Sequence, residues 1–386
     1  MSLLRKIRSI DIYIFIWFIY QLLGVQKYAG SGMLLMVLNV WSFFDLVMLH
    51  NKTKVSKNVI IFDIFTAILV LYGLAFWLFG QQYPGVAPRA YVLHVWASLV
   101  PFYTIYRASM MGKLTKERVV FWIIPFFIVA ILKYRYLEQQ KLELLMMGED
   151  KEIVNNGGYI ILALLPLCGF MKKRVSQVVA ILVSFYFIFT SFKRGSMLIF
   201  AVCIVYYLYS TINSSRQKIG SILLFCILFY FMYDFLLNLL ASSDMFQFKL
   251  AQTMEGDSSH RNLIFAKLWE AMLNADPIHF LFGYGAYATM GIAGIFAHND
   301  WLEIFVDQGL VGVVIHAIFC WNLIMVCRKE QRGSDARLAL GLFAIIYIMT
   351  TMFSMAFDRV RLYEMMAFAY FVAIQDNRVK YGLIDS

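Results

Sequence analysis

Charged side chains are scarce in this sequence. Lys, Arg, Asp and Glu make up 15% of the 386 residues, while apolar residues make up 61% and the mean hydropathy is +0.69. An ordinary soluble domain carries about 25% charged and roughly 45–50% apolar residues. This shortage of charge excludes a soluble globular protein and predicts an all-α protein that crosses a membrane several times.

Signatures of cofactor, metal and nucleotide chemistry are missing as well. The five cysteines fall within or at the edge of hydrophobic segments, so they predict no disulfide framework, and no metal-ligand spacing is present. The sequence contains no P-loop, no G-x-G-x-x-G and no H-E-x-x-H motif. The lack of two similar halves also counts against transporter folds built from repeats. We therefore expect an activity that needs no cofactor and no metal.

Long hydrophobic runs dominate the rest of the chain. A helix needs about 20 mainly apolar residues to cross roughly 30 Å of hydrocarbon. The sequence contains about twelve such runs, so we expect one membrane-embedded domain over residues 1–386, built as a bundle of about twelve transmembrane helices. The runs are 10–24, 30–49, 58–79, 89–106, 119–133, 157–171, 175–191, 195–213, 219–241, 302–327, 337–354 and 362–375.

Lys and Arg are concentrated in alternate connections between these runs. With the N-terminus inside, the cytoplasmic segments hold 21 of the 34 Lys and Arg residues but only five acidic residues. Basic residues in short loops favour the cytoplasmic side, so this asymmetry predicts that both termini are cytoplasmic. It also accounts for the net charge of +10 without a nucleic-acid partner.

The longest interruption of the hydrophobic pattern is the predicted external (periplasmic or extracellular) loop 242–297, which has 56 residues. Loops of this length are usually either functional or disordered. Within the loop, Ser259 is a suitable cap for a helix that runs to about Asn274. One stripe of this helix is apolar, which predicts an amphipathic helix on the membrane surface beside the site. The stripe consists of Ile264, Leu268 and Met272.

The end of this loop combines chain breaks with a polar helix start. Gly283-Tyr284-Gly285 and Gly291 are expected to break the chain and turn it back. They are followed by His298-Asn299, directly before the tenth hydrophobic run. Asp300 and Glu303 have the D-x-x-E spacing of a capping box, which predicts a structural role for both.

Three polar helix starts are predicted on the external side. Arg194 opens the eighth run, Arg261 lies in the first turn of the loop helix, and His298 precedes the tenth run. A cation at a helix N-terminus opposes the helix dipole by about 0.3–1 kcal/mol. The two arginines are therefore mildly misplaced unless an anion lies between them. A phosphate or diphosphate is the expected anion, because helix N-termini and guanidinium groups both bind it.

These features occur in a recognisable order over residues 191–312. In order and spacing they resemble the O-antigen ligase and O-antigen polymerase superfamily of bacterial integral membrane enzymes. The residues that carry the resemblance are Ser191-x-x-Arg194-Gly195, Arg261, Gly283-Tyr284-Gly285, His298-Asn299-x-x-Leu302, Gly309 and Gly312.

The resemblance implies a metal-independent membrane glycosyltransferase. Its donor would be an undecaprenyl diphosphate-linked oligosaccharide, and its acceptor a hydroxyl group of a second glycan. By position, Arg194 and Arg261 would bind the donor diphosphate, and His298 would accept the proton of the acceptor hydroxyl. Diphosphate is a good leaving group, so charge stabilisation and one general base suffice, and a histidine with a pKa of about 6.5 suits that role. Further candidates for sugar-binding or supporting contacts are Tyr284, Asn299, Glu303 and Asp307.

Three functions remain open at this point. The favoured one is polymerisation of O-antigen, capsule or exopolysaccharide units at the outer face of the bacterial cytoplasmic (inner) membrane, because the external loop is modest in size. The second is ligation of finished polymer to a lipid A core or another final acceptor. The third is a non-enzymatic flippase for lipid-linked oligosaccharide, which the placement of the arginines on one face disfavours. Expected partners are the lipid-linked donor, the lipid bilayer and a chain-length regulator.

Overall fold

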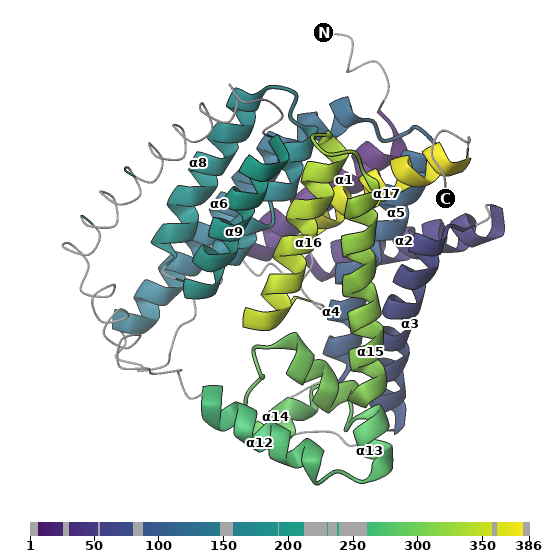
Figure 1. The fold of residues 1–386 in the computed structure, drawn as a ribbon, viewed down its shortest axis with the longest axis vertical. Helices are drawn as coiled ribbons and strands as arrows, with labels where there is room; N and C mark the ends of the chain where they lie inside the picture. Colours follow the sequence, from purple (N-terminus) through teal and green to yellow (C-terminus); the bar gives the residue numbers. More distant parts are fainter. Residues whose placement is uncertain are drawn as a thin grey trace.

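The computed structural model describes residues 7–25, 31–52, 55–79, 88–146, 157–191, 193–211, 230, 238, 261–356 and 361–380. Every regular element in these ranges is helical, with no strand (Figure 1). The elements are α1 (Ser9–Val25), α2 (Ser31–Lys52), α3 (Lys57–Phe79), α4 (Pro88–Leu99), α5 (Pro101–Met110), α6 (Lys116–Met146), α7 (Gly157–Leu162), η2 (Leu165–Phe170), α8 (Arg174–Thr190), α9 (Arg194–Thr211), α12 (Arg261–Leu273), α13 (Pro277–Phe282), α14 (Ala288–Ala293), α15 (Asp300–Lys329), α16 (Asp335–Phe353) and α17 (Leu362–Lys380).

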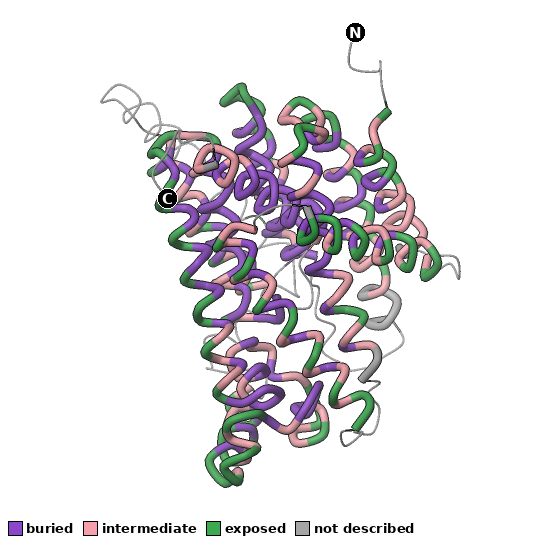
Figure 2. Tube along the Cα trace, turned by 90° about the vertical axis from the view of Figure 1, so that its right-hand side faces the viewer, coloured by how far each residue is buried: buried purple, intermediate pink, exposed green. Residues whose placement is uncertain are grey.

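The helices follow the predicted hydrophobic runs closely. Among the described residues, six helices are long and apolar enough to cross a membrane, and three shorter apolar helices accompany them. Most of the long helices have both buried and exposed residues, and many of the exposed ones are large and apolar, as expected where lipid replaces water (Figure 2). The predicted all-α, polytopic membrane fold is thereby confirmed. The ninth predicted run, 219–241, lies outside the described residues apart from two isolated positions.

Two of the predicted helices are interrupted near a proline. Run 89–106 forms α4 and α5, and Pro101 opens α5. Run 157–171 forms α7 and the 3-10 helix η2, with Pro166 in the first turn of η2. Proline has no backbone N–H and clashes with the preceding turn, so it favours a new helix start in both places. Hydrophobicity alone does not reveal such breaks.

Helix α15 is divided by a break at Gly309. This residue has a φ of 66° and a ψ of −163°, far from helical values. A Cβ atom here would overlap the carbonyl group of Leu281 in α13, so glycine lets the two backbones approach closely. The short segment 300–308 therefore belongs with α12, α13 and α14, while segment 310–329 runs through the bundle (Figure 1).

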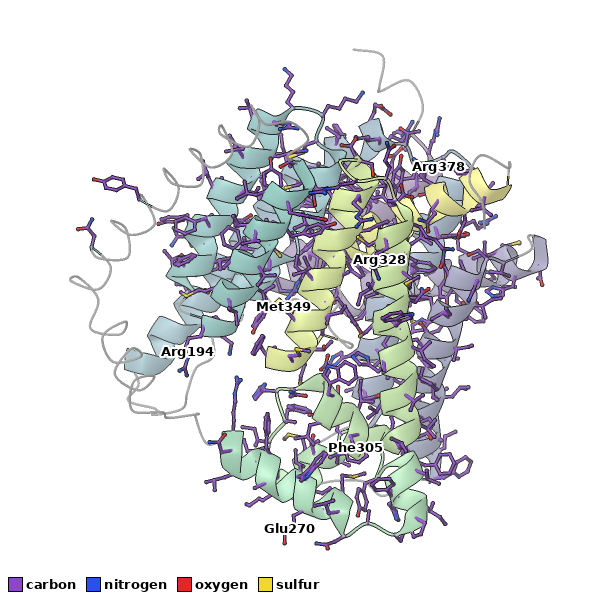
Figure 3. All side chains as sticks on the ribbon, in the orientation of Figure 1. Arg194, Glu270, Phe305, Arg328, Met349 and Arg378 are labelled. Carbon is purple, nitrogen blue, oxygen red and sulfur yellow. The ribbon has the colours of Figure 1, made fainter. Side chains whose placement is uncertain are left out.

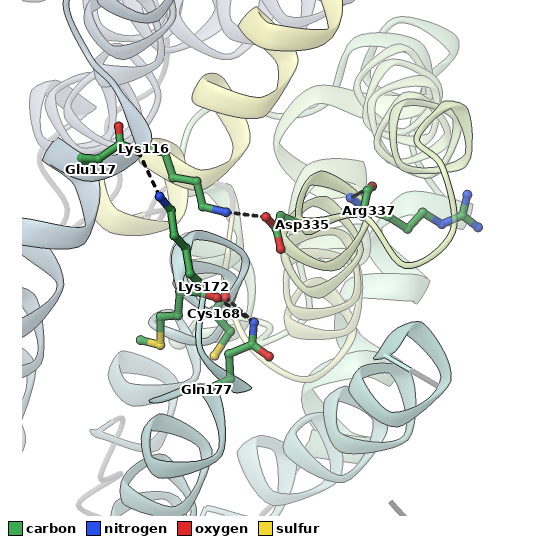
Figure 4. Close-up of polar contacts among 9 residues, drawn as sticks. Lys116, Glu117, Cys168, Lys172, Gln177, Asp335 and Arg337 are labelled. Carbon is green, nitrogen blue, oxygen red and sulfur yellow. Dashed lines mark hydrogen bonds and ion pairs between the residues drawn. The ribbon is translucent and has the colours of Figure 1, made fainter. Parts of the chain in front are cut away.

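The basic connections lie at one end of the bundle. Lys116 at the start of α6 pairs with Asp335 at the start of α16 (Figure 4). Arg328 and Arg378 lie toward the same end, and Arg194 lies toward the opposite one (Figure 3). This separation agrees with the alternation of basic residues in the sequence. The side of the membrane on which each end lies stays a prediction.

The other end is closed by a helical cap, defined here as residues 261–299. The cap has its own small core, separate from the main core of the bundle. The apolar stripe of α12 is buried in that core, which confirms the predicted helix and its stripe. The stripe packs against Ala288, Ala297 and Val306, and the place of α12 at the membrane surface stays a prediction. The predicted helix cap Ser259 lies outside the described residues.

Helix α16 connects the main core to the cap. It packs against α9, η2, α15 and α17. Phe343 of α16 stacks on Phe368 of α17, with ring centroids 4.9 Å apart and planes inclined by 12°. Such packing fixes the last turn of α16, from about Thr350 to Phe353, beside the starts of α9 and α15.

Candidate active site

His298 lies in the loop that joins α14 to α15. Its backbone is left-handed, with a φ of 52°, a conformation that few non-glycine residues adopt and that is enriched in histidine. Held backbone strain of this kind clusters at functional sites. The residue is partly buried, so the loop both constrains His298 and leaves part of it accessible.

Asn299 caps α15 and joins it to α16. Its side-chain Oδ1 accepts a hydrogen bond from the Leu302 N–H at 3.1 Å, while its Nδ2 donates to the Met352 carbonyl oxygen at 3.0 Å. Both the oxygen and the nitrogen of the Asn299 side-chain amide are thus used in structural hydrogen bonds. The start of α15 is thereby attached to the last turn of α16.

The predicted capping box is wrong by one residue. Asn299, and not Asp300, is the cap of α15. The carboxylate of Asp300 instead accepts the Ala356 N–H at 2.7 Å. The carboxylate of Glu303 accepts the Ala297 N–H at 2.8 Å and the hydroxyl of Thr289. Both acids therefore have structural contacts. Their partners lie outside α15, in the segments that pack against its first turns.

Asp307, one helical turn after Glu303, also binds backbone N–H groups of the cap. Its carboxylate accepts the N–H groups of Tyr287 and Ala288, each at 2.9 Å. Tyr287 also has a left-handed backbone, with a φ of 60°. Glu303 and Asp307 are 0% and 1% exposed, so both carboxylates support the loop from inside. Direct sugar contact by either stays a prediction from the sequence.

The predicted glycine turn is confirmed at two of its three glycines. Gly283 and Gly285 have φ values of 77° and 112°. Gly291 was expected to break the chain but lies within α14, and Gly294 ends that helix instead with a φ of 76°. A left-handed residue is the usual helix terminator, and Gly294 meets this requirement three residues later in the chain.

Tyr284 is partly buried between α12 and α13. Its hydroxyl donates to the Ala271 carbonyl oxygen at 3.2 Å, and its ring stacks on His279 with centroids 4.6 Å apart. Partial burial and the charge of Asp276 raise the pKa of Tyr284 above its usual value, so the phenol stays neutral at physiological pH. Its present contacts hold the cap together, and a role in sugar binding stays a prediction.

Arg194 begins α9 and is exposed at the end of the bundle that faces the cap (Figure 3). The next residue, Gly195, allows a close approach of two neighbours. A Cβ atom at this position would overlap the Tyr159 hydroxyl and would lie 3.2 Å from Cβ of Phe353. The start of α9 thus packs closely against both α7 and the end of α16.

Arg261 begins α12, as the sequence predicts. It is partly buried and lies within electrostatic range of the Tyr159 hydroxyl. The start of α9, through Gly195, and Arg261 at the start of α12 therefore both lie near Tyr159. Asn299, the residue after His298, donates a hydrogen bond to Met352, the residue before Phe353.

The last turn of α16 thus lies near the helix starts that carry the three predicted residues, and direct contact among Arg194, Arg261 and His298 stays a prediction. Met352 contacts the start of α15, and Phe353 contacts the start of α9. The adjacent Ser354 lies beside the Tyr159 hydroxyl, which faces Arg261. The structure places the three helix starts around one end of one helix, although they are far apart in the sequence.

Arg361 is a further residue of this region that the sequence reasoning missed. Its Nη1 donates to the Tyr159 carbonyl oxygen at 3.3 Å and lies 3.9 Å from Oε2 of Glu364. The four residues Tyr159, Ser354, Arg361 and Glu364 help to line a cavity of about 40 Å³. Arg361 directly precedes α17, so it shares with Arg194 and Arg261 the sequence feature of an arginine at a helix start.

An apolar groove runs along the cap beside His298. It has a volume of about 700 Å³ and lies between α12 and α15. One end of its lining is Asn299, the neighbour of His298. Its other lining residues are almost all apolar or aromatic and include Phe265, Trp269, Trp301 and Phe305. Within the described part of the chain, no group of three or more His, Cys, Asp or Glu residues is placed to hold a metal ion.

Glu303→Ala is expected to destabilise the cap and to reduce the activity of the site. The change would leave the Ala297 N–H and the Thr289 hydroxyl buried without their acceptor, at a cost of about 1–3 kcal/mol for each unsatisfied group. Thermal unfolding of the purified protein should show a lower transition temperature. The matched control is Glu270→Ala, which removes an exposed carboxylate of α12 (Figure 3). Equal transition temperatures for the two variants would contradict the supporting role of Glu303.

Comparison with known protein families places part of the chain. Residues 179–317 match a family model described as O-antigen ligase. No curated protein matches the chain. The matched residues include Arg194, Arg261 and His298, and they extend from α8 through the cap into α15. Over residues 179–317, the match confirms the resemblance of this chain to the O-antigen ligase and polymerase superfamily.

Proposed function

We propose that this protein polymerises surface polysaccharide by transferring a glycan from an undecaprenyl diphosphate-linked donor to a hydroxyl of a second glycan. The observation that carries the proposal is the meeting of three helix starts at the last turn of α16. Two of them carry Arg194 and Arg261, and the third carries His298. Family membership of this segment supports an O-antigen ligase or polymerase type of enzyme.

The arginines supply what a diphosphate leaving group needs. Negative charge grows on the diphosphate as its bond to the sugar breaks, and fixed positive charge lowers the energy of that transition state. Each arginine lies at a helix N-terminus, where the helix dipole also favours a bound anion. The anion also removes the unfavourable interaction between each arginine and its helix dipole.

His298 completes the reaction as general base. A partly accessible imidazole can accept the proton of the acceptor hydroxyl while the oxygen attacks the sugar. Hydrogen bonds to Glu303 and Met352 hold its two neighbours, Ala297 and Asn299, so the backbone at His298 is positioned before substrate arrives. This chemistry uses no cofactor or metal.

The apolar groove between α12 and α15 suits the polyprenyl chain of the donor. Most of its lining is aromatic or aliphatic, and the lining also includes Asn299, which follows His298 in the sequence. A diphosphate held by the arginines could thus remain attached to a lipid that lies in the groove. The proposed setting is the bacterial cytoplasmic (inner) membrane, with both termini in the cytoplasm and the cap outside. A chain-length regulator is a further expected partner.

A ligase is the second candidate, because the matching family model is described as O-antigen ligase. A ligase would use the same residues but would transfer finished polymer to a final acceptor. The two activities differ in the acceptor and not in the chemistry of the donor. The described site therefore serves either activity.

Analysis of surface polysaccharide from a deletion strain tests the proposal. Single repeat units on the final acceptor are expected for a lost polymerase. Full-length polymer stranded on the lipid carrier would instead identify a ligase. Accumulation of repeat units on the cytoplasmic side would identify a flippase and would contradict an enzymatic role. Restoration by the plasmid-borne wild-type gene is the control.

A further inference from the structure

We propose that the Tyr159 hydroxyl is a further substrate-binding group, which donates a hydrogen bond to the phosphate oxygens of the donor. This inference rests on the proposed function, because it adds a residue to the same anion site. Tyr159 lies in α7, outside the segment that matches the family model.

The position of Tyr159 is fixed from several directions. The preceding residue, Gly158, packs against the turn between α8 and α9, where a Cβ atom would lie 2.6 Å from the Ser191 Oγ and would overlap that of Ser196. The carbonyl oxygen of Tyr159 accepts the hydrogen bond from Arg361. The start of α7 is thereby attached to both α9 and α17, and the tyrosine ring has little freedom to move.

The hydroxyl of Tyr159 has an unused hydrogen-bonding capacity. Tyr159 is 6% exposed, and its hydroxyl makes no hydrogen bond of acceptable geometry with any residue that the structure describes, although Ser354 lies beside it. Burying a hydroxyl without a partner costs free energy, and most buried polar groups in proteins are paired. An exception beside a candidate site calls for a functional explanation.

The surroundings of the hydroxyl identify its missing partner as an oxyanion. Gly195, against which the hydroxyl lies, directly follows Arg194. Arg261 acts on the same hydroxyl through space. A phosphate held by Arg261 near the start of α9 would therefore lie next to this O–H donor. A hydrogen bond from a neutral donor to a charged acceptor is stronger than one between two neutral groups. The Tyr159 hydroxyl would therefore add to the binding of the phosphate by the arginines.

Tyr159→Phe tests the proposal, because it removes one oxygen atom and keeps the ring. The readouts are affinity for undecaprenyl diphosphate and the rate of glycan transfer, both measured on purified protein in lipid nanodiscs. Affinity for the lipid diphosphate is expected to fall about 10–100-fold, the range for losing one hydrogen bond to a charged group. Thermal stability should stay the same or rise, because an unpaired buried hydroxyl is lost.

Tyr363→Phe is the matched control. Tyr363 is also buried, and its hydroxyl donates to the carbonyl oxygen of Ile160, the residue after Tyr159. Its loss should lower stability slightly and leave affinity for lipid diphosphate within about twofold of the wild type. Equal losses of affinity in Tyr159→Phe and Tyr363→Phe would show that the substitutions weaken binding by disturbing the packing of the helices. That result would overturn the inference.

Gly195→Ala perturbs the same hydroxyl from the other side. Its methyl group would overlap the hydroxyl oxygen of Tyr159, so binding should again weaken. In the Tyr159→Phe background the same change should cost much less, because the overlapping atom is gone. Additive losses would show that Gly195→Ala acts independently of the hydroxyl, which would count against the proposal.

The outcomes separate this inference from the proposed function. Wild-type protein that binds lipid diphosphate and transfers glycan, with Tyr159→Phe equal to it, overturns the role of the hydroxyl alone; an ordered water would then be its partner. Wild-type protein that neither binds lipid diphosphate nor transfers glycan overturns both proposals. Selective loss in Tyr159→Phe, with a normal Tyr363→Phe, supports both.

Discussion

His298→Ala is expected to slow glycan transfer by about 10²–10⁴-fold, the range usual for the loss of one general acid–base group. Binding of the lipid-linked donor should stay nearly normal, because the proposed donor contacts are made by Arg194 and Arg261. The measurement is single-turnover transfer by purified protein, alongside equilibrium binding of undecaprenyl diphosphate.

His279→Ala is the matched control for this experiment. His279 is a second cap histidine, but it stacks on Tyr284 and does not precede α15. Its loss should leave transfer within a few-fold of the wild type. Near-normal turnover by His298→Ala would remove His298 from the chemistry. Glu303 and Asp307 would be poor replacements as base, because their carboxylates are buried and bonded to backbone N–H groups.

Arg194→Lys and Arg261→Ala are expected to reduce transfer by about 10²–10³-fold each, as found for the loss of one group that stabilises developing charge. Lysine keeps the positive charge of Arg194 but lacks the planar guanidinium group that binds two phosphate oxygens at once. Arg194→Lys should therefore retain only part of the transfer activity. The measurements are polymer yield in cells and transfer rate on purified protein, normalised to the amount of protein in the membrane.

Lys267→Ala is the control for the arginine variants. Lys267 is an exposed cation on α12, the helix that Arg261 begins. Its loss should leave polymer yield unchanged, because its charge is screened by water and salt. Full-length polymer in normal amounts from both Arg194→Ala and Arg261→Ala would show that these arginines merely anchor helix ends at the membrane interface.

Local features were the most predictable part of the fold. Hydrophobic length fixes where a helix can cross a bilayer, so most of the predicted runs correspond to described helices. The stripe of Ile264, Leu268 and Met272 was correct because helical periodicity decides which side chains share a face. Arg194 and Arg261 were correctly placed at helix starts for similar local reasons.

Features that depend on distant contacts were not predictable in the same way. The partner of Asp300 is the backbone of Ala356, far along the chain, and so the D-x-x-E spacing was misleading. Likewise, the α12 stripe packs against Ala288, Ala297 and Val306, which only the folded chain brings beside it. Tyr159 carried no motif at all, and its relation to Gly195 arises from packing between α7 and α9.

The break at Gly309 divides α15 into a first segment that resembles the interior of a water-soluble protein and a second segment suited to lipid. Three buried carboxylates, those of Asp300, Glu303 and Asp307, occur before the break, and each accepts a backbone N–H, as in the interior of a water-soluble protein. No acidic residue occurs between Gly309 and Glu330, as a lipid environment requires. Natural variation should therefore follow two separate rules within α15: buried carboxylates that bind backbone N–H groups retained before position 309, and acidic residues excluded between 309 and 330.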